Sequence, residues 1–156
     1  MARDTVLILD TDKHATWTLK TLLEIEQYPV VVADTLEQAI KDLSEFQISG
    51  FVTEYRIEGV KTLETIGKLK EMSPETYVMM ITDKEMKEDE YEEIMQAGID
   101  DYFLKPIPIW KILVHLRKGF NNRDLLIEKK RLQRSVETLR PSKGGDVAKS
   151  EEALPG

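Results

Sequence analysis

The sequence predicts a doubly wound parallel α/β sheet of five strands with helices on both faces. Five short apolar runs alternate with segments of helical periodicity, and this alternation is typical of successive βαβ units. The runs are almost continuously apolar, as strands that are buried on both faces require. Right-handed crossovers then place all five strands parallel. The predicted strands span residues 6–9, 30–33, 51–54, 77–82 and 102–104.

Each connecting segment has apolar residues at spacings of three and four, which favours an amphipathic helix. Pro29 lies just beyond the first helix, and Thr35 with Gln38 predicts a capping box at the start of the second. Gly98 is the expected C-cap of the fourth helix. The predicted inward-facing residues are Ala15, Leu19, Leu22 and Leu23; Leu36, Ala39, Ile40 and Leu43; Leu63, Ile66, Leu69 and Met72; Met86, Tyr91, Ile94, Met95 and Ala97; Ile109, Ile112, Leu113, Leu116 and Phe120.

The composition limits the classes of protein to consider. The chain has 156 residues, enough for one domain and an appendage, and its net charge of −7 argues against a nucleic-acid surface. The absence of cysteine excludes disulfides, thiol catalysis and cysteine-ligated metals, and fits a reducing compartment. No window approaches eighteen consecutive apolar residues, and no signal-peptide core follows Met1. We therefore expect a cytoplasmic protein without a membrane span.

Polar residues follow four of the predicted strands. The carboxyl ends of parallel strands share one edge of the sheet, where ligands of open α/β folds bind. Carboxylates, a hydroxyl and an ammonium together at this edge favour a site for a cation or a phosphoryl group. These residues are Asp10, Thr11 and Asp12 after the first strand, Glu54 at the end of the third, Thr82 at the end of the fourth and Lys105 after the fifth.

Four segments in register resemble the receiver domain of bacterial two-component response regulators. They span residues 6–12, 52–56, 80–83 and 97–106, and the most specific has the pattern Ala-Gly-x-Asp-Asp-Tyr-x-x-Lys-Pro. The resemblance covers residues 4–120. It implies a flavodoxin-like fold with strand order 2-1-3-4-5 and a signalling module of a phosphorelay rather than an enzyme.

The residues that would accept a phosphoryl group depart from the family pattern. Receivers hold Mg²⁺ with two acids after the first strand, here Asp10 and Thr11, and phosphorylate an Asp after the third strand, here Glu54. A Glu adds about 1.5 Å of reach, and Thr11 replaces a carboxylate that Mg²⁺ prefers. Receivers often carry an acid at the position of Asp12, so this residue is no evidence that the carboxylate missing at Thr11 is replaced. The resemblance therefore implies a degenerate receiver in which Asp10 and Glu54 bind Mg²⁺ weakly or not at all.

The residues that sense phosphorylation in this family are present. Thr82 matches the hydroxyl that contacts the phosphoryl group, Lys105 before Pro106 matches the lysine that pairs with it, and Tyr102 matches the switch aromatic. Glu54 is predicted either to pair with Lys105 and Thr82 in a partly active arrangement or to belong to an unswitched scaffold.

Other interpretations of single residues stay open. Asp10 and Asp12 are also suited to cap the first helix, and Tyr102 is also suited to the core. His14 and His115 are predicted to be surface residues, and both tryptophans, Trp17 and Trp110, to be half-buried.

Two other functions remain in consideration. The first is a response regulator that is phosphorylated at a noncanonical site. The second is a flavodoxin-like enzyme or ligand-binding protein, which would need a phosphate-binding loop, and no glycine-rich turn follows the first strand.

An acidic run at residues 88–93 is typical of a solvated helix face, and it also lies where the resemblance places a partner protein. In receivers the fourth helix belongs to a partner-binding face together with the fifth strand and the fifth helix. We therefore expect a basic protein partner on this face.

The last part of the chain carries a second helical pattern. In the helical extension 121–140, Leu125, Leu132 and Leu139 repeat every seven residues, with Asn122, Lys129 and Val136 at the matching a positions. This pattern predicts a parallel homodimer through a short coiled coil, the alternative being a solvated helix that folds back on the domain. Residues 141–156 are expected to form a flexible tail.

Overall fold

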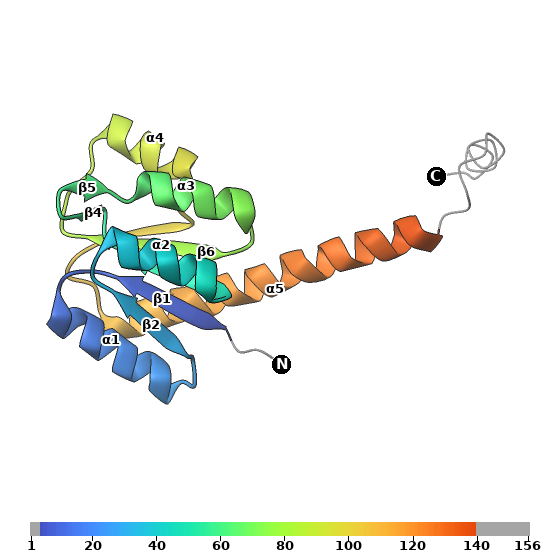
Figure 1. Cartoon of the computed structure of the whole chain (residues 1–156), viewed down its shortest axis with the longest axis horizontal. Coiled ribbons are helices and arrows are strands. Elements are labelled where there is room, and N and C mark those ends of the chain that lie inside the picture. Colours follow the sequence, from blue (N-terminus) through green and yellow to red (C-terminus); the bar gives the residue numbers. More distant parts are fainter. Residues whose placement is uncertain (1–3, 140–156) are drawn as a thin grey trace. The chain divides into compact units, whose positions relative to one another are not determined.

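The structure, a computed structural model, describes residues 4–139 and contains a five-stranded parallel sheet (Figure 1). The order is β2-β1-β3-β6-β7, which is the predicted doubly wound order once the two short strands of a hairpin, β4 and β5, are set aside. The fold class is confirmed. The strands are β1 (Thr5–Leu9), β2 (Val30–Ala33), β3 (Ile48–Thr53), β6 (Tyr77–Thr82) and β7 (Asp101–Leu104).

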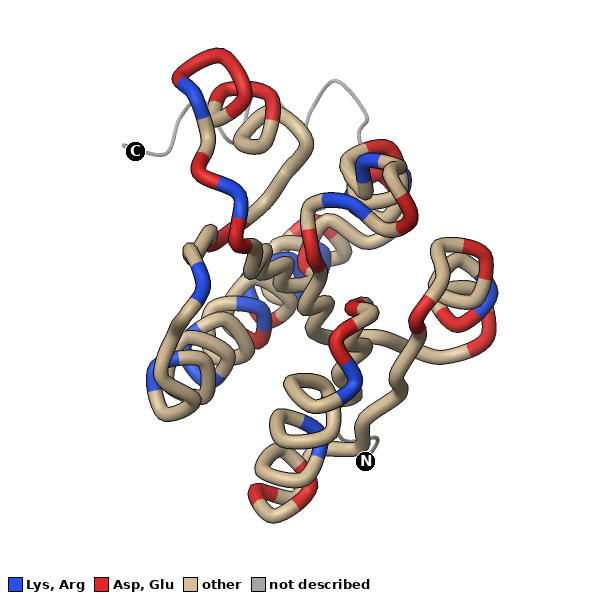
Figure 2. The backbone as a smooth tube through the Cα atoms, turned by 90° about the vertical axis from the view of Figure 1, so that its left-hand side faces the viewer, with Lys and Arg blue, Asp and Glu red and all other residues tan. Residues whose placement is uncertain are grey.

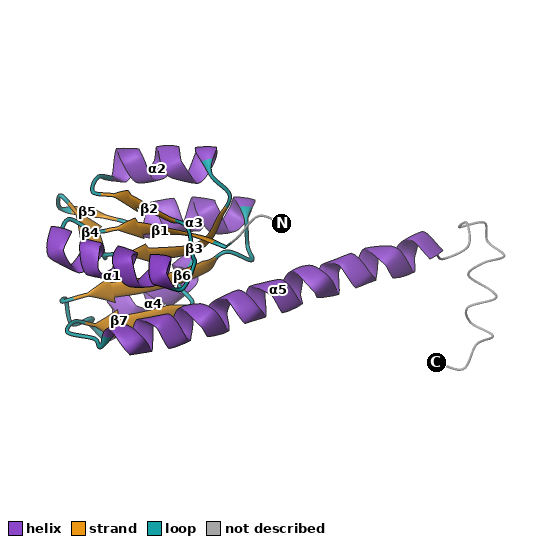
Figure 3. Cartoon of the chain, turned by 90° about the horizontal axis from the view of Figure 1, so that it is seen from below, coloured by secondary structure: helices purple, strands orange, loops and turns teal. Residues whose placement is uncertain are grey.

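Five helices cover the two faces of the sheet (Figure 3). One apolar cluster joins β1, β3 and β6 to residues of α2, α3 and α4, and a second joins the opposite face of these strands to α1 and α5. The helices are α1 (Lys13–Ile25), α2 (Leu36–Glu45), α3 (Leu63–Met72), α4 (Glu88–Ala97) and α5 (Ile109–Leu139).

Helix ends follow the predicted signals with one exception. Gly98 has φ 103° and ends α4 in the left-handed region that favours glycine. The Thr35 hydroxyl accepts a hydrogen bond from the Gln38 amide at the start of α2. The Gln38 side chain donates instead to Asp42 at 2.8 Å. The predicted return hydrogen bond between the Gln38 side chain and the Thr35 amide is therefore wrong, because this side chain bonds to Asp42 one turn further along the helix.

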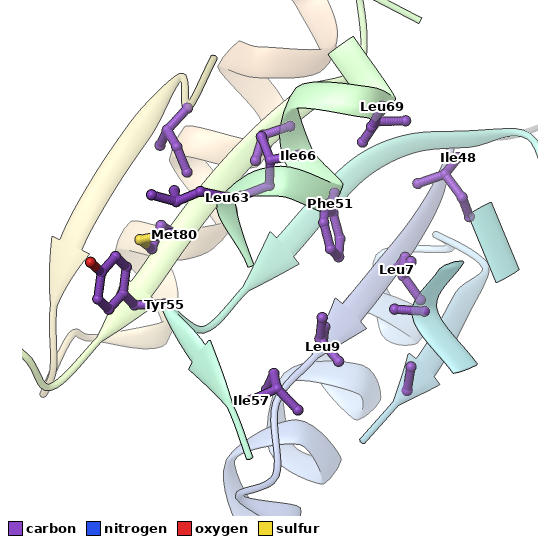
Figure 4. Packing of buried hydrophobic residues seen from close by; sticks show 14 of the residues in the cluster. Leu7, Leu9, Ile48, Phe51, Tyr55, Ile57, Leu63, Ile66, Leu69 and Met80 are labelled. Carbon is purple, nitrogen blue, oxygen red and sulfur yellow. The ribbon is translucent and has the colours of Figure 1, made fainter. Parts of the chain in front are cut away.

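The segment after β3 is a small β-hairpin, formed by β4 (Arg56–Ile57) and β5 (Val60–Lys61). Tyr55 and Ile57 are buried in the first apolar cluster, and Figure 4 shows them pointing into the same core as Leu9 and Met80. Burial of these two side chains fixes the hairpin against the carboxyl edge of the sheet.

Several predicted core positions are exposed. Ile40, Met72, Tyr91 and Met95 all lie largely at the surface, although their helices form as predicted. Helix α2 packs over the edge strand β2 and its neighbour β1, so only a narrow stripe of it faces the sheet. Ile40 falls outside that stripe, and Met72 is the last residue of α3. The expected inward stripes were therefore too wide.

The tryptophans and one histidine also differ from expectation. Trp17 and Trp110 are 65% and 66% exposed, so half-burial is wrong for both. His115 is half-buried: its ring packs on Phe103, and its Nδ1 lies 3.7 Å from Asp101. The inward side of α5 is occupied by apolar residues, which leaves Trp110 on the outer side.

The chain divides into two compact units, residues 1–123 and 124–156. The described part of the second unit is the remainder of helix α5, which confirms the predicted helical pattern to Leu139. The predicted tail 141–156 lies outside the described residues. Among the helices of residues 4–139, none is long and apolar enough to cross a membrane.

Candidate functional site

The carboxyl edge of the sheet brings three predicted site residues into contact. Asp10 directly follows β1, Glu54 follows the central strand β3, and Lys105 follows β7. The Lys105 Nζ lies 3.0 Å from Asp10 Oδ2 and 3.2 Å from Glu54 Oε2. The ammonium that follows β7 therefore bridges the carboxylates that follow β1 and β3 at the carboxyl edge of the sheet.

This bridge is largely shielded from water. The side chains of Asp10 and Glu54 are 15% and 14% exposed, and that of Lys105 is 27% exposed. Burial by itself lowers the pKa of Lys105, but the hydrogen bonds and charges of Asp10, and then of Glu54, outweigh this effect and the pKa lies above its usual value. The ammonium is thus held in its charged form between its two partners.

The second oxygen of each carboxylate accepts a hydrogen bond from the backbone. The Tyr55 amide donates to Glu54 Oε1 at 2.7 Å, and the Asp12 amide donates to Asp10 Oδ1 at 3.0 Å. All four carboxylate oxygens therefore have donors within the chain. Charge-assisted hydrogen bonds of this kind are the stronger ones in proteins.

Thr62 holds the backbone around Glu54 and was not singled out from the sequence. Its buried hydroxyl lies 2.8 Å from the Glu54 carbonyl and 3.1 Å from the Tyr55 carbonyl. The Glu54 amide in turn donates to the Leu9 carbonyl at 3.0 Å. A threonine just before a predicted helix was the available signal, and it indicated a cap rather than this contact.

The other two residues of the first loop, Thr11 and Asp12, do not complete a metal site. Asp12 caps α1, its Oδ1 accepting from the Ala15 amide at 3.1 Å, and Thr11 is exposed. Within residues 4–139, no group of three or more acidic, histidine or cysteine side chains is arranged to hold a metal ion. With an ammonium already between Asp10 and Glu54, these residues do not fit Mg²⁺.

Thr82 and Tyr102 meet at a different point. The Thr82 hydroxyl accepts a hydrogen bond from the Lys84 amide at 3.2 Å, and the Tyr102 hydroxyl donates to the Lys84 carbonyl at 2.8 Å. Among the described residues, Thr82 makes no hydrogen bond to Glu54. The two expected switch residues are instead joined through the backbone of Lys84, a residue that sequence reasoning missed because the path of this loop carries no sequence signal.

The same loop is tied to helix α4. The Lys84 ammonium lies 3.2 Å from Glu90, and the Tyr91 ring packs edge-on against the ring of Tyr102. Burial first, and then the nearby acids Glu85 and Glu54, raise the pKa of Tyr102, while a backbone hydrogen bond lowers it. Tyr102 is thus a neutral, half-buried phenol of β7 that packs against α4.

Lys105 also fixes the end of β7 to that of β6. Its amide donates to the Thr82 carbonyl at 2.8 Å, and the peptide bond to Pro106 is cis. The backbone of Lys105 therefore contacts Thr82, while its side chain contacts Asp10 and Glu54.

Fold and site together define a doubly wound α/β domain with a lysine held against carboxylates at the carboxyl edge, the arrangement of phosphorelay receivers. The chain belongs to the response regulator receiver domain family, whose model matches residues 6–117.

Two curated relatives agree with this family. The transcriptional regulatory protein CpxR of Escherichia coli is 30% identical over 112 residues, which are 72% of this chain and 47% of that protein. The uncharacterized transcriptional regulatory protein YkoG of Bacillus subtilis is 23% identical over 117 residues, 75% of this chain and 51% of that protein. The chain spans about half the length of the curated relatives it matches.

Solved structures share the fold. A CheY-like receiver domain protein from Methanospirillum hungatei has a TM-score of 0.74 at 20% identity, covering 79% of this chain and 98% of that one. The beryllofluoride-activated NtrC4 receiver domain dimer has a TM-score of 0.69 at 25% identity, covering 76% and 98%. These likenesses support the flavodoxin-like fold described above.

Proposed function

We propose that this chain is a degenerate receiver of a two-component system, which does not use phosphorylation of Glu54 and acts through protein contacts rather than as an enzyme. The observation that carries the proposal is the occupied state of the acidic edge. Glu54 stands at the position that follows the central strand, and both of its oxygens already have donors, Lys105 and the Tyr55 amide. The cytoplasmic location expected from the composition is part of this proposal.

The length of the Glu54 side chain supports it. A glutamate places its carboxylate about 1.5 Å further out than an aspartate would. Misplacement by about 1 Å is enough to lower a rate on the order of a hundredfold. Thr11 adds a second loss, since it offers no carboxylate to a metal ion. Both departures act against phosphoryl transfer.

We further propose that Glu54 belongs to an unswitched scaffold rather than to an imitation of the phosphorylated state. Of the two contacts expected for such an imitation, the one with Lys105 is present at 3.2 Å, and the one with Thr82 is not. Thr82 and Tyr102 are held by Lys84 instead. Glu54 therefore neutralises Lys105 without engaging the switch residues.

Phosphorylation is tested by incubating the whole chain with Mg²⁺ and a small phosphodonor and measuring its intact mass. We expect no adduct on the wild-type chain and one phosphoryl group on the Thr11→Asp/Glu54→Asp double variant, which restores the family pattern. An adduct on the wild-type chain would contradict the proposal and favour the phosphorylatable alternative; peptide mapping would then locate the site.

We propose the face formed by α4, β7 and α5 as the surface for a protein partner. Acidic positions gather in the first turn of α4 (Figure 2), namely Glu88, Asp89 and Glu90. Tyr91 and Met95 are exposed on the same helix, and Leu104 is exposed on β7. An aromatic and aliphatic centre bordered by acids suits a basic protein.

We propose that the C-terminal part of α5 forms a parallel homodimer. Leu125, Leu132 and Leu139 are 67%, 51% and 82% exposed, although they repeat at heptad spacing. Leu125, Leu132 and Val136 border one groove of this helix. A second copy would bury this stripe and bring the nearby Glu128–Arg131 pairs together.

The oligomeric state tests this part of the proposal. Light scattering during size exclusion is expected to give a dimer for the wild-type chain and a monomer for Leu132→Lys. The matched control is Thr138→Lys, which introduces the same charge at a position that is neither a nor d of the heptad and is expected to stay dimeric. A monomeric wild-type chain would contradict the coiled coil.

A further inference from the structure

We propose that Lys129 selects the partner of the C-terminal helix, so that a helix with a carboxylate opposite this lysine binds more tightly than a second copy of the chain. Lys129 lies at an a position of the heptad pattern, one turn from Leu125 and one turn from Leu132. It borders the same groove of α5 as these two leucines and Val136. A charged side chain therefore stands within the apolar stripe. Because Lys129 faces a partner only in a parallel pairing of helices, this selection rests on the coiled coil proposed above.

No carboxylate of residues 4–139 pairs with Lys129. Glu128, the adjacent acid, is already engaged by Arg131, whose Nε lies 3.0 Å from Glu128 Oε2 and whose terminal nitrogen contacts Oε1. Glu137 borders the same groove but lies two turns further along, about 12 Å at the rise of a helix. The ammonium of Lys129 is therefore left to a group on another chain.

A second copy of the chain supplies the wrong charge. In a parallel dimer of identical helices the a positions face each other, so Lys129 meets the Lys129 of the second copy. Two ammonium groups at an apolar seam repel each other and lose part of their hydration. The methylene stem still packs along the neighbouring leucines while the ammonium reaches water, so the homodimer is weakened rather than abolished.

The charges around Lys129 favour the same kind of partner. Residues 128–134 hold four cations, Lys129, Lys130, Arg131 and Arg134, against the single carboxylate of Glu128, although the whole chain has a net charge of −7. An acidic helix is attracted to this segment and a basic helix is repelled. The expected partner is an amphipathic helix with apolar residues at heptad spacing and an Asp or Glu at the a position that faces Lys129.

The Lys129→Glu variant of the whole chain serves as the acidic partner. It is isotope-labelled and mixed with the unlabelled wild-type chain, and the dimers are counted by native mass spectrometry. A heterodimer about tenfold tighter than either homodimer makes up about nine-tenths of the dimers, whereas statistical mixing gives half. The matched control Lys130→Glu makes the same change of charge outside the seam and is expected to mix statistically. Statistical mixing of Lys129→Glu, or equal enrichment with Lys130→Glu, would overturn the proposal.

Removal of the charge gives a second readout. Lys129→Met keeps a long side chain without the ammonium, and the dissociation constant of its homodimer in sedimentation equilibrium is expected to be about tenfold lower than that of the wild type. An unchanged constant would show that Lys129 does not lie at the seam and would refute the selection.

The same measurements separate this selection from the coiled coil on which it rests. If the wild type, Lys129→Met and the mixture with Lys129→Glu are all monomeric, the coiled coil fails and the selection fails with it. Dimers that mix statistically refute the selection alone. A wild-type chain that pairs with Lys129→Glu but not with itself supports the selection and contradicts the homodimer.

Discussion

Replacing Lys105 with methionine removes the ammonium that joins Asp10 and Glu54 and leaves two carboxylates facing each other. Removing one partner of a buried ion pair costs about 3–5 kcal/mol, whereas exposed pairs contribute about 0–1 kcal/mol. The two carboxylates are 15% and 14% exposed, and the lysine is 27% exposed, so the site lies nearer the buried case but retains some solvent screening. We expect a loss of about 2–3 kcal/mol in the free energy of unfolding.

Urea unfolding followed by circular dichroism measures this loss, and the melting temperature is expected to fall by about 10 °C. Adding Glu54→Gln to Lys105→Met removes one unpaired charge and is expected to recover part of the loss. The control is Lys68→Met, because Lys68 pairs with Glu64 at 3.3 Å on an exposed face and is expected to change stability by less than about 0.5 kcal/mol. If Lys105→Met unfolds like this control, the bridge does not stabilise the domain and the reasoning fails.

Three further predictions concern stability. The pKa of Lys105 is raised in the folded chain, so its contribution to the free energy of unfolding is fully present below the usual pKa of 10.5 and is lost as pH rises through the higher folded pKa. Above about pH 10.5 the wild type should therefore lose more stability than Lys105→Met. Gly119→Ala would place a Cβ 2.3 Å from the Tyr77 ring and should cost about 1–3 kcal/mol, whereas Gly67→Ala meets open space and should be neutral or stabilising in thermal unfolding. Thr62→Val removes a buried hydroxyl from two backbone carbonyls, and a loss of about 1–2 kcal/mol by urea titration is expected, while no loss would contradict its role.

The fold and part of the site could be predicted from the sequence because their signals are local or periodic. Strands such as β6 are continuous apolar runs, and the topology then brings their carboxyl ends together. The meeting of Asp10, Glu54 and Lys105 follows from strand order alone, and the structure has these three in contact.

The features that the sequence did not reveal depend on how particular segments pack. The hairpin after β3 forms because Tyr55 and Ile57 are buried in the core; Gly59 marks its turn, but the sequence does not show that these two side chains are buried. The link from Thr82 to Tyr102 depends on the path of the backbone at Lys84. These are tertiary contacts, and neither propensity nor periodicity encodes them.

The number of phosphoryl groups on the wild-type chain, beside that on the Thr11→Asp/Glu54→Asp variant, tests the central claim most directly. Intact mass is measured for both chains after the same incubation with Mg²⁺ and a small phosphodonor. A degenerate receiver predicts no group on the wild type and one on the variant. A wild-type chain that carries one phosphoryl group, mapped to Glu54, would contradict the account.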